Sequence, residues 1–265
     1  MDNYVNEKDY DLLDQDKYTF FVLRRIIDGD CELLLSDHER LIICFTAFPF
    51  PVWIWTPEDA SEVELERAYL LARENDLLDG KHRFNLKYEP AEYFLKRAVK
   101  DGINFVISTN MYAYDCPEPI EPEEKADGYL YKCSEIDIDD LMDFMEMFHE
   151  EIGIDKQDRE SYYDAAVEDI KSGKMYFWKN SKGENTASCK YVPTEQMASI
   201  NLVYTIPEYR RKHYAQNLVY QVTLKVKEEG LKPMLYTDAD YIASNACYEK
   251  IGYILRGKLC TISPE

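Results

Sequence analysis

Three positively charged residues, Arg210, Arg211 and Lys212, stand between a predicted strand and a predicted helix. The strand is Ile200–Thr205, which is apolar, β-branched and aromatic. The helix is indicated by apolar residues at helical spacing, namely Ala215, Leu218, Val219, Val222 and Val226. The first N–H groups of a helix lack partners within the helix, and the helix dipole adds partial positive charge there. Cations at such a helix start cost roughly 0.3–1 kcal/mol each. The arrangement therefore predicts an anion site, which a pyrophosphate would fit.

Two segments resemble the coenzyme-binding motifs of the GNAT N-acetyltransferases. The first, Val203-Tyr204-Thr205-Ile206-Pro207-Glu208-Tyr209-Arg210-Arg211-Lys212-His213-Tyr214-Ala215, is similar to the acetyl-CoA signature with the core Q/R-x-x-G-x-G/A. The second runs from Tyr236 to Tyr253 and is similar to the family's second CoA segment, whose ending Y-x-K-x-G-F/Y is here Tyr248-Glu249-Lys250-Ile251-Gly252-Tyr253. The resemblance covers about residues 127–262. It implies an α/β (α+β) fold of GNAT type, with a mixed, mainly antiparallel twisted sheet flanked by helices, and acetyl-CoA as co-substrate.

The resemblance also implies where the coenzyme lies. Backbone groups of Val203, Tyr204 and Thr205 would pair with the pantetheine amides as an added strand. An arginine would hold phosphate oxygens in a bidentate manner and a lysine would act as a point charge. Backbone N–H groups would bind the pyrophosphate, so the predicted contacts in this loop are Arg210, Arg211, Lys212, His213, Tyr214, Ala215 and Gln216. The alternative for the basic cluster is a solvated surface.

Two positions depart from the family pattern. His213 stands where the signature has glycine, and Tyr241 stands where the second segment has asparagine. A glycine lets the backbone approach a phosphate closely, so the His213 side chain must point away from the anion. Asn245, one helical turn after Tyr241, could supply the missing amide. These departures keep open a second function, a non-catalytic acyl-CoA-binding or interaction module.

The resemblance implies that Tyr248 hydrogen-bonds the CoA sulfur and protonates the departing thiolate. A tyrosine hydroxyl suits this role because its reference pKa is ~10 and it is a neutral donor at pH 7. The alternative for Tyr248 is packing on an amphipathic helix. Asp238 follows a predicted strand and is the candidate general base by position, although it could instead cap the helix that begins near Ile242. Glu195 and Tyr204 are lesser candidates for the base.

The composition limits the possible partners. The chain has 51 acidic and 31 basic residues and a formal net charge of −20, which disfavours nucleic acid and makes a cationic amine plausible as acceptor. The start Met1-Asp2-Asn3-Tyr4 is acidic and polar and predicts no signal peptide, and no apolar run is long enough to cross a membrane. The seven cysteines are scattered, which suits a cytoplasmic protein without disulfides, zinc or another metal. We expect a monomer or a homodimer.

The chain is expected to form two domains joined by a linker. Residues 116–126 are rich in proline and acid and predict the linker, which separates a 1–115 α/β domain from a 127–265 GNAT acetyltransferase domain. The stretch Trp53–Pro57 precedes Val203–Pro207 by 150 residues, and Thr56 with Pro57 predicts a helix start. After Trp53–Pro57 come the acidic residues Glu58, Asp59, Glu62 and Glu64, whereas basic residues follow Val203–Pro207. The first domain is therefore either a degenerate, non-cofactor copy of the second or an unrelated α+β domain.

Within the second domain, Asp137 is predicted to cap one helix and a further helix is predicted over about 157–171, with Tyr163 facing inward. Taken together, these features predict an N-acetyltransferase that moves an acetyl group from acetyl-CoA directly to a primary amine in a ternary complex. A polyamine, an aminoglycoside-like compound or a protein amino group would suit the acidic chain as acceptor.

Overall fold

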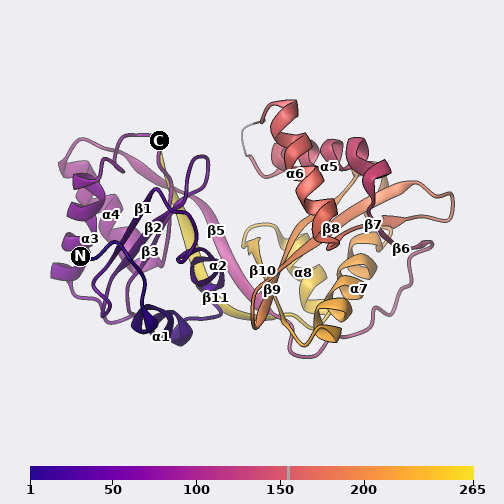
Figure 1. Cartoon of the computed structure of the whole chain (residues 1–265), viewed down its shortest axis with the longest axis horizontal. Coiled ribbons are helices and arrows are strands. Elements are labelled where there is room, and N and C mark those ends of the chain that lie inside the picture. Colours follow the sequence, from indigo (N-terminus) through magenta and orange to yellow (C-terminus); the bar gives the residue numbers. More distant parts are fainter. Residues whose placement is uncertain (154–155) are drawn as a thin grey trace. The chain divides into compact units, whose positions relative to one another are not determined.

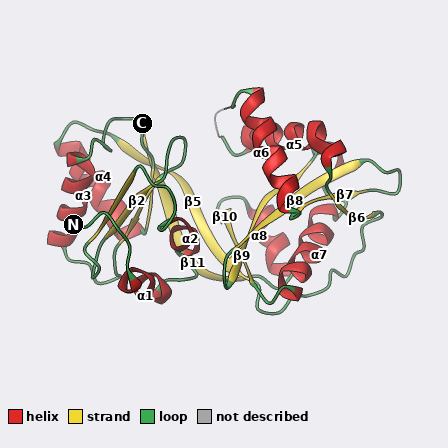
Figure 2. Ribbon diagram, viewed as in Figure 1, coloured by secondary structure: helices red, strands yellow, loops and turns green. Residues whose placement is uncertain are grey.

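The computed structural model describes residues 1–153 and 156–265, and the chain forms two compact units (Figure 1). Unit 1 comprises Met1–Tyr114, Tyr236–Ile242 and Leu255–Glu265, and unit 2 comprises Asp115–Leu235 and Ala243–Ile254. Each unit contains a sheet flanked by helices (Figure 2). The predicted mixed α/β class is confirmed. The units differ from the expected domains in two respects: two segments after residue 235 belong to unit 1, and the expected linker, 116–126, belongs to unit 2.

Unit 1 is built around a sheet in the order β1-β2-β3-β4-β11-β5. Its elements are α1 (Glu7–Gln15), α2 (Phe21–Ile26), β1 (Leu33–Ser36), β2 (Ile42–Phe45), β3 (Val52–Trp55), α3 (Glu62–Glu74), β4 (Phe84–Leu86), α4 (Tyr88–Lys100), β5 (Phe105–Asp115) and β11 (Ile254–Pro264). The last strand of the chain therefore lies between β4 and β5. It runs antiparallel to β4, with Cys260 opposite Leu86 and Ile262 opposite Phe84.

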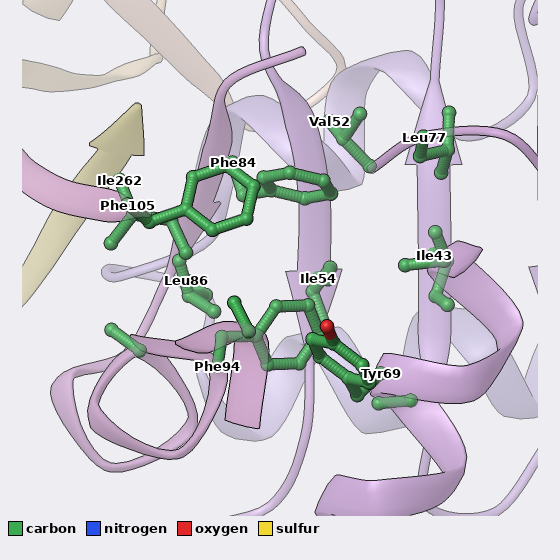
Figure 3. Packing of buried hydrophobic residues seen from close by; sticks show 14 of the residues in the cluster. Ile43, Val52, Ile54, Tyr69, Leu77, Phe84, Leu86, Phe94, Phe105 and Ile262 are labelled. Carbon is green, nitrogen blue, oxygen red and sulfur yellow. The ribbon is translucent and has the colours of Figure 1, made fainter. Parts of the chain in front are cut away.

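The core of unit 1 packs helices α3 and α4 on this sheet (Figure 3). Tyr69 of α3 and Phe94 of α4 meet edge to face with ring centroids 5.3 Å apart. Ile262 of β11 is fully buried in the same cluster. The end of the chain is thus part of the hydrophobic core of unit 1.

Unit 2 has the sheet order β10-β9-β8-β7-β6, in which β10 is parallel to β9 and the other neighbours are antiparallel. Its elements are β6 (Tyr129–Lys132), the 3-10 turn η1 (Glu135–Asp137), α5 (Ile138–Glu151), α6 (Arg159–Ser172), β7 (Met175–Lys179), β8 (Asn185–Pro193), β9 (Met197–Thr205), the 3-10 turn η2 (Pro207–Tyr209), α7 (Tyr214–Glu228), β10 (Lys232–Asp238) and α8 (Ile242–Lys250). The end of β10 from Tyr236 and the first residue of α8, Ile242, are counted with unit 1. One cluster of its core joins α5 and α6 to β7 and β9 through residues such as Phe144, Phe177 and Tyr204.

Three local predictions are wrong. Helix α3 begins at Glu62 rather than beside Thr56, because Ser61 and Glu64 form a reciprocal capping box that fixes the helix start there. Asp137 is the N-cap residue of α5, but its side chain does not bond to that helix; its carboxylate instead accepts the backbone N–H of Ser134, just before η1, at 2.8 Å. Tyr163 is 49 % exposed, since its neighbour Tyr162 takes the inward position on α6.

All seven cysteines are free thiols in the structure. In the described parts of the chain, no helix combines the length and the apolar character needed to cross a membrane.

Candidate functional site

Strands β9 and β10 pair over a short distance only. Their parallel register joins Met197–Ser199 to Lys232–Met234, whereas β9 continues to Thr205. Leu202 has a positive φ of 50°, and the register of β9 against β8 shifts nearby, as expected for a β-bulge. Within the described residues, no pairing joins the backbone of Ile200–Thr205 to β10. This edge of β9 could accept an extended ligand as an added strand.

The turn after β9 leads to a helix start without a side-chain cap. Arg211 and His213 have φ values of 60° and 63°, and α7 begins at Tyr214 with no side-chain cap among the described residues. The backbone N–H of Asn217 donates to the carbonyl oxygen of His213 at 3.0 Å. The N–H groups before Asn217, on residues 214–216, precede this bond and are oriented as helix-start donors. Because Arg211 and Lys212 are exposed beside them, this end of α7 is suited to an anion.

The conformation of His213 explains why a glycine is typical at this position. Its φ lies in the left-handed region, which glycine adopts without steric cost and which histidine adopts more often than most other residues. Residue 213 therefore has a backbone conformation that a glycine would adopt without cost, although a histidine stands there.

The Arg210 side chain contacts residues of unit 2. Its Nε donates to the carbonyl oxygen of Thr205 at 3.0 Å, and its guanidinium forms an ion pair with Glu151 at the end of α5. The same guanidinium lies 5.7 Å from the ring centroid of Tyr204. Arg210 thus connects the end of β9 to the end of α5. Its predicted contact with phosphate stays a prediction.

Acidic residues before β6 contact the start of α7. The Nε2 atom of His213 lies 2.8 Å from Oε2 of Glu124, and the hydroxyl of Tyr214 donates to Oδ1 of Asp127 at 2.6 Å. Asp127 also accepts the backbone N–H of Ser181 at 2.9 Å. The Tyr214 hydroxyl, followed by Ser181, lowers the pKa of Asp127 to about 2. The sequence does not predict these contacts, because the acids of residues 118–127 have no periodic pattern that assigns them a partner.

Tyr248 and Asn245 are buried residues of α8 in unit 2. The ring of Tyr248 packs edge to face on Tyr253 with centroids 5.9 Å apart. Burial raises the pKa of Tyr248, so its hydroxyl keeps its proton at neutral pH. Tyr204 in β9 is also buried, and desolvation, then the Glu151 carboxylate, raise its pKa.

Asp238 and Tyr241 belong to unit 1, whereas Tyr248 and Asn245 belong to unit 2. The carboxylate of Asp238 accepts the backbone N–H of Asp240 at 2.9 Å, and its carbonyl accepts the N–H of Tyr241 at 3.2 Å. Asp238 therefore stabilises the turn that precedes α8. Its assignment as general base remains a prediction, and so does the contact of Tyr241 with the coenzyme.

The start of α3 in unit 1 holds an acidic side chain of its own helix. The Glu64 carboxylate accepts the backbone N–H of Ser61 at 2.7 Å and forms an ion pair with Arg40. Arg40, followed by Ser61, lowers the pKa of Glu64 to about 2. The start of α3 is thus occupied by a carboxylate of its own helix, unlike the start of α7.

Over residues 1–153 and 156–265, no group of three or more histidine, cysteine or acidic residues is arranged to hold a metal ion.

One family model and many solved structures match this chain. Residues 181–262 match the family model described as FR47-like protein. A search of curated proteins gave no match. Among solved structures, a GCN5-related N-acetyltransferase from Sphaerobacter thermophilus is similar with a TM-score of 0.66 at 11 % identity, covering 92 % of this chain and 85 % of that one. A GNAT acetyltransferase from Colwellia psychrerythraea has a TM-score of 0.59 at 11 % identity, covering 96 % and 97 %.

A GCN5-related N-acetyltransferase from Kribbella flavida is also similar, with a TM-score of 0.58 at 13 % identity and coverage of 87 % of this chain and 88 % of that one. These similarities extend over both units, while the family model matches the segment that contains β9, α7 and α8. The chain has the fold of the GNAT acetyltransferases, and its residues 181–262 match the FR47-like model.

Proposed function

We propose that unit 2 binds acetyl-CoA and transfers its acetyl group to a primary amine of an acceptor within a ternary complex. The observation that carries this proposal is the start of α7, which has no side-chain cap and lies one turn after the part of β9 that has no described pairing with β10. Both features lie in the segment that matches the FR47-like model. An open strand edge followed by a helix start suits an extended amide chain that ends in a diphosphate.

In this proposal, backbone groups of Val203–Thr205 pair with the pantetheine amides. The N–H groups of residues 211–216 bind the diphosphate, and the side chains of Arg211 and Lys212 add positive charge. Asn245 and Tyr241 are the proposed coenzyme contacts after β10. The phosphate contact proposed for Arg210 would require its guanidinium to reach beyond Thr205 and Glu151.

The acetyl transfer forms a C–N bond and breaks a C–S bond. The acceptor nitrogen attacks the thioester carbonyl carbon, and a backbone N–H near Val203 or Tyr204 polarises the carbonyl oxygen. The nitrogen loses a proton to Asp238, directly or through a water molecule, and the leaving thiolate takes a proton from Tyr248. The products are the amide and CoA as a thiol, while Asp238 is left protonated and Tyr248 deprotonated. Passage of this proton from Asp238 to Tyr248 through water restores both groups, so atoms and charges balance.

Unit 1 is proposed to be a copy of the fold that does not bind the coenzyme. Support comes from the start of α3, where Glu64 and Arg40 fill the position that a diphosphate would need. A second anion there would meet the Glu64 carboxylate and would have to displace the capping box.

Acetyl-CoA binding is the first test. Calorimetry or thermal shift should detect binding, and acetyl-CoA at 100 times its dissociation constant should add ~2.7 kcal/mol of stability. Exchange of both Arg211 and Lys212 for alanine should weaken acetyl-CoA binding. Lys171→Ala removes an exposed cation from α6 and serves as the control, which should leave binding unchanged. Thiol release across a panel of primary amines then tests transfer. Absence of acetyl-CoA binding to the unmodified protein would contradict the proposed function.

A second function is a non-catalytic acyl-CoA-binding module. It is favoured by the two residues that depart from the family pattern, His213 and Tyr241, the second of which is exposed. This function predicts a thermal shift with acetyl-CoA, no thiol release with any amine of the panel, and no effect of Tyr248→Phe on either measurement.

A further inference from the structure

The segment before β6 contacts the residue at which the coenzyme signature departs from glycine. His213 has a φ of 63° and brings an imidazole to the start of α7, where glycine would bring no side chain. An imidazole beside the N–H groups of residues 214–216 could cover them. The direction of this ring therefore decides whether a diphosphate can reach the helix.

The structure fixes that direction through Glu124. The Nε2 atom of His213 lies 2.8 Å from Oε2 of Glu124. The backbone of Glu124 is held in turn by Asn217, whose Nδ2 donates to the carbonyl oxygens of both Glu124 and His213, at 3.0 Å each. Asn217 is buried, so its amide holds the two carbonyls in a fixed relation. Glu124 is thereby placed where its side chain can hold the imidazole.

A second contact strengthens the same junction. The hydroxyl of Tyr214 donates to Asp127, whose other oxygen accepts the N–H of Ser181. Two consecutive residues at the start of α7 are thus bound to two acids of the preceding segment. Residues 124–127, at the end of the predicted linker, therefore contact the start of α7.

We propose that Glu124 is a positioning residue for coenzyme binding: it holds the His213 imidazole on residues 124–127 and so leaves the N–H groups of residues 214–216 to the diphosphate. This inference rests on the proposed function, because it concerns the same anion site. It explains how the chain tolerates a histidine at the glycine position. Glu124 and His213 would then act as a pair that replaces one glycine.

The test is a double-mutant cycle measured by calorimetry with CoA at constant ionic strength. Glu124→Ala should raise the dissociation constant by about twofold to fivefold, the range of an exposed ion pair. Glu124→Gln should stay near the unmodified value, because its amide oxygen can still accept from the imidazole N–H. In a His213→Gly background, Glu124→Ala should have no effect, since no ring remains to be held.

The matched control is Glu121→Ala, which removes one charge from the same segment. Glu121 pairs with Lys125 rather than with His213, so this change should leave the dissociation constant unaltered in both backgrounds. Thermal unfolding of each variant checks that unit 2 remains folded. If the effect of Glu124→Ala on CoA binding disappears in the His213→Gly background, a general loss of structure is excluded as its cause.

Two results would overturn the inference while leaving the proposed function intact. If Glu124→Ala tightens CoA binding in both backgrounds, the carboxylate competes with the diphosphate. If Glu124→Ala weakens CoA binding equally with histidine and with glycine at position 213, Glu124 acts through residues 124–127 and not through His213. Failure of the unmodified protein to bind CoA would overturn the proposed function and this inference together.

Discussion

The Nε atom of Arg210 donates a hydrogen bond to the carbonyl oxygen of Thr205 at 3.0 Å. The first residue of the basic cluster is therefore attached to the last residue of β9. Because the guanidinium also pairs with Glu151, Arg210 joins the strand end to α5 of the same unit. The rest of the cluster, Arg211 and Lys212, is exposed and lies nearer to the start of α7.

Substitution of Arg210 by alanine should lower the free energy of unfolding of unit 2 by about 1 kcal/mol. This value is expected from the loss of one hydrogen bond and one partly exposed ion pair. Urea denaturation followed by hydrogen exchange in β9 measures it, with Lys171→Ala as the control. Weaker CoA binding at unchanged stability would instead identify Arg210 as a direct phosphate ligand.

Replacement of Ile262 by alanine should destabilise unit 1, although this residue lies only three positions before Glu265. Ile262 is fully buried among the residues that pack between the sheet and helices α3 and α4 (Figure 3). Removal of such a side chain costs about 2–5 kcal/mol. Hydrogen exchange of β3 and β4 measures the loss, and Leu255→Ala, in a partly exposed part of β11, should have a small effect. Equal effects of the two changes would contradict the assignment of β11 to this core.

The sequence predicts the local elements of the site but not all of its contacts. The apolar run of β9, the proline after it and the helical spacing of α7 are visible in the residues themselves, and so is the basic cluster between them. The position of β11 depends on which strands it pairs with, and a strand pattern alone does not name its neighbours. The start of α3 was misplaced because Thr56-Pro57 is a good local signal, while the Ser61–Glu64 capping box satisfies more donors.

His38 should make the stability of unit 1 depend on pH. Desolvation lowers its pKa, but hydrogen bonds from the ring to Asp9 at 2.7 Å and to Asp2 at 3.1 Å outweigh it, so the pKa is raised. A raised pKa in the folded state means that protonated His38 stabilises the fold. This contribution is complete below the unfolded-state pKa of about 6.5 and is lost as the pH rises through the higher folded-state value.

The measurement is the difference in melting temperature between the unmodified protein and His38→Asn from pH 5 to pH 9. Asparagine tolerates the positive φ of 58° at this position and does not titrate. The difference should be largest at the acidic end and should shrink as the pH rises. A difference that is constant over this range would show that the ring stabilises unit 1 without a change in its charge.

Exchange of Tyr248 for phenylalanine should lower kcat for thiol release by about 10²-fold, the lower range for loss of a general acid, and should leave the dissociation constant of acetyl-CoA nearly unchanged. The phenyl ring keeps the edge-to-face contact with Tyr253, so the melting temperature should change little. Burial raises the pKa of Tyr248, and the hydroxyl therefore remains a proton donor at alkaline pH, so its ionisation should not limit kcat up to about pH 9.

Tyr253→Phe is the matched control, because it also removes one buried hydroxyl. That hydroxyl lies 2.7 Å from Oγ1 of Thr223, and its loss should reduce stability by about 1 kcal/mol while kcat is retained. The two variants thus separate a chemical role from a packing role at neighbouring tyrosines. If Tyr248→Phe lowers stability and leaves kcat unaltered, Tyr248 is a structural residue of α8, and the proton for the thiolate must come from another group.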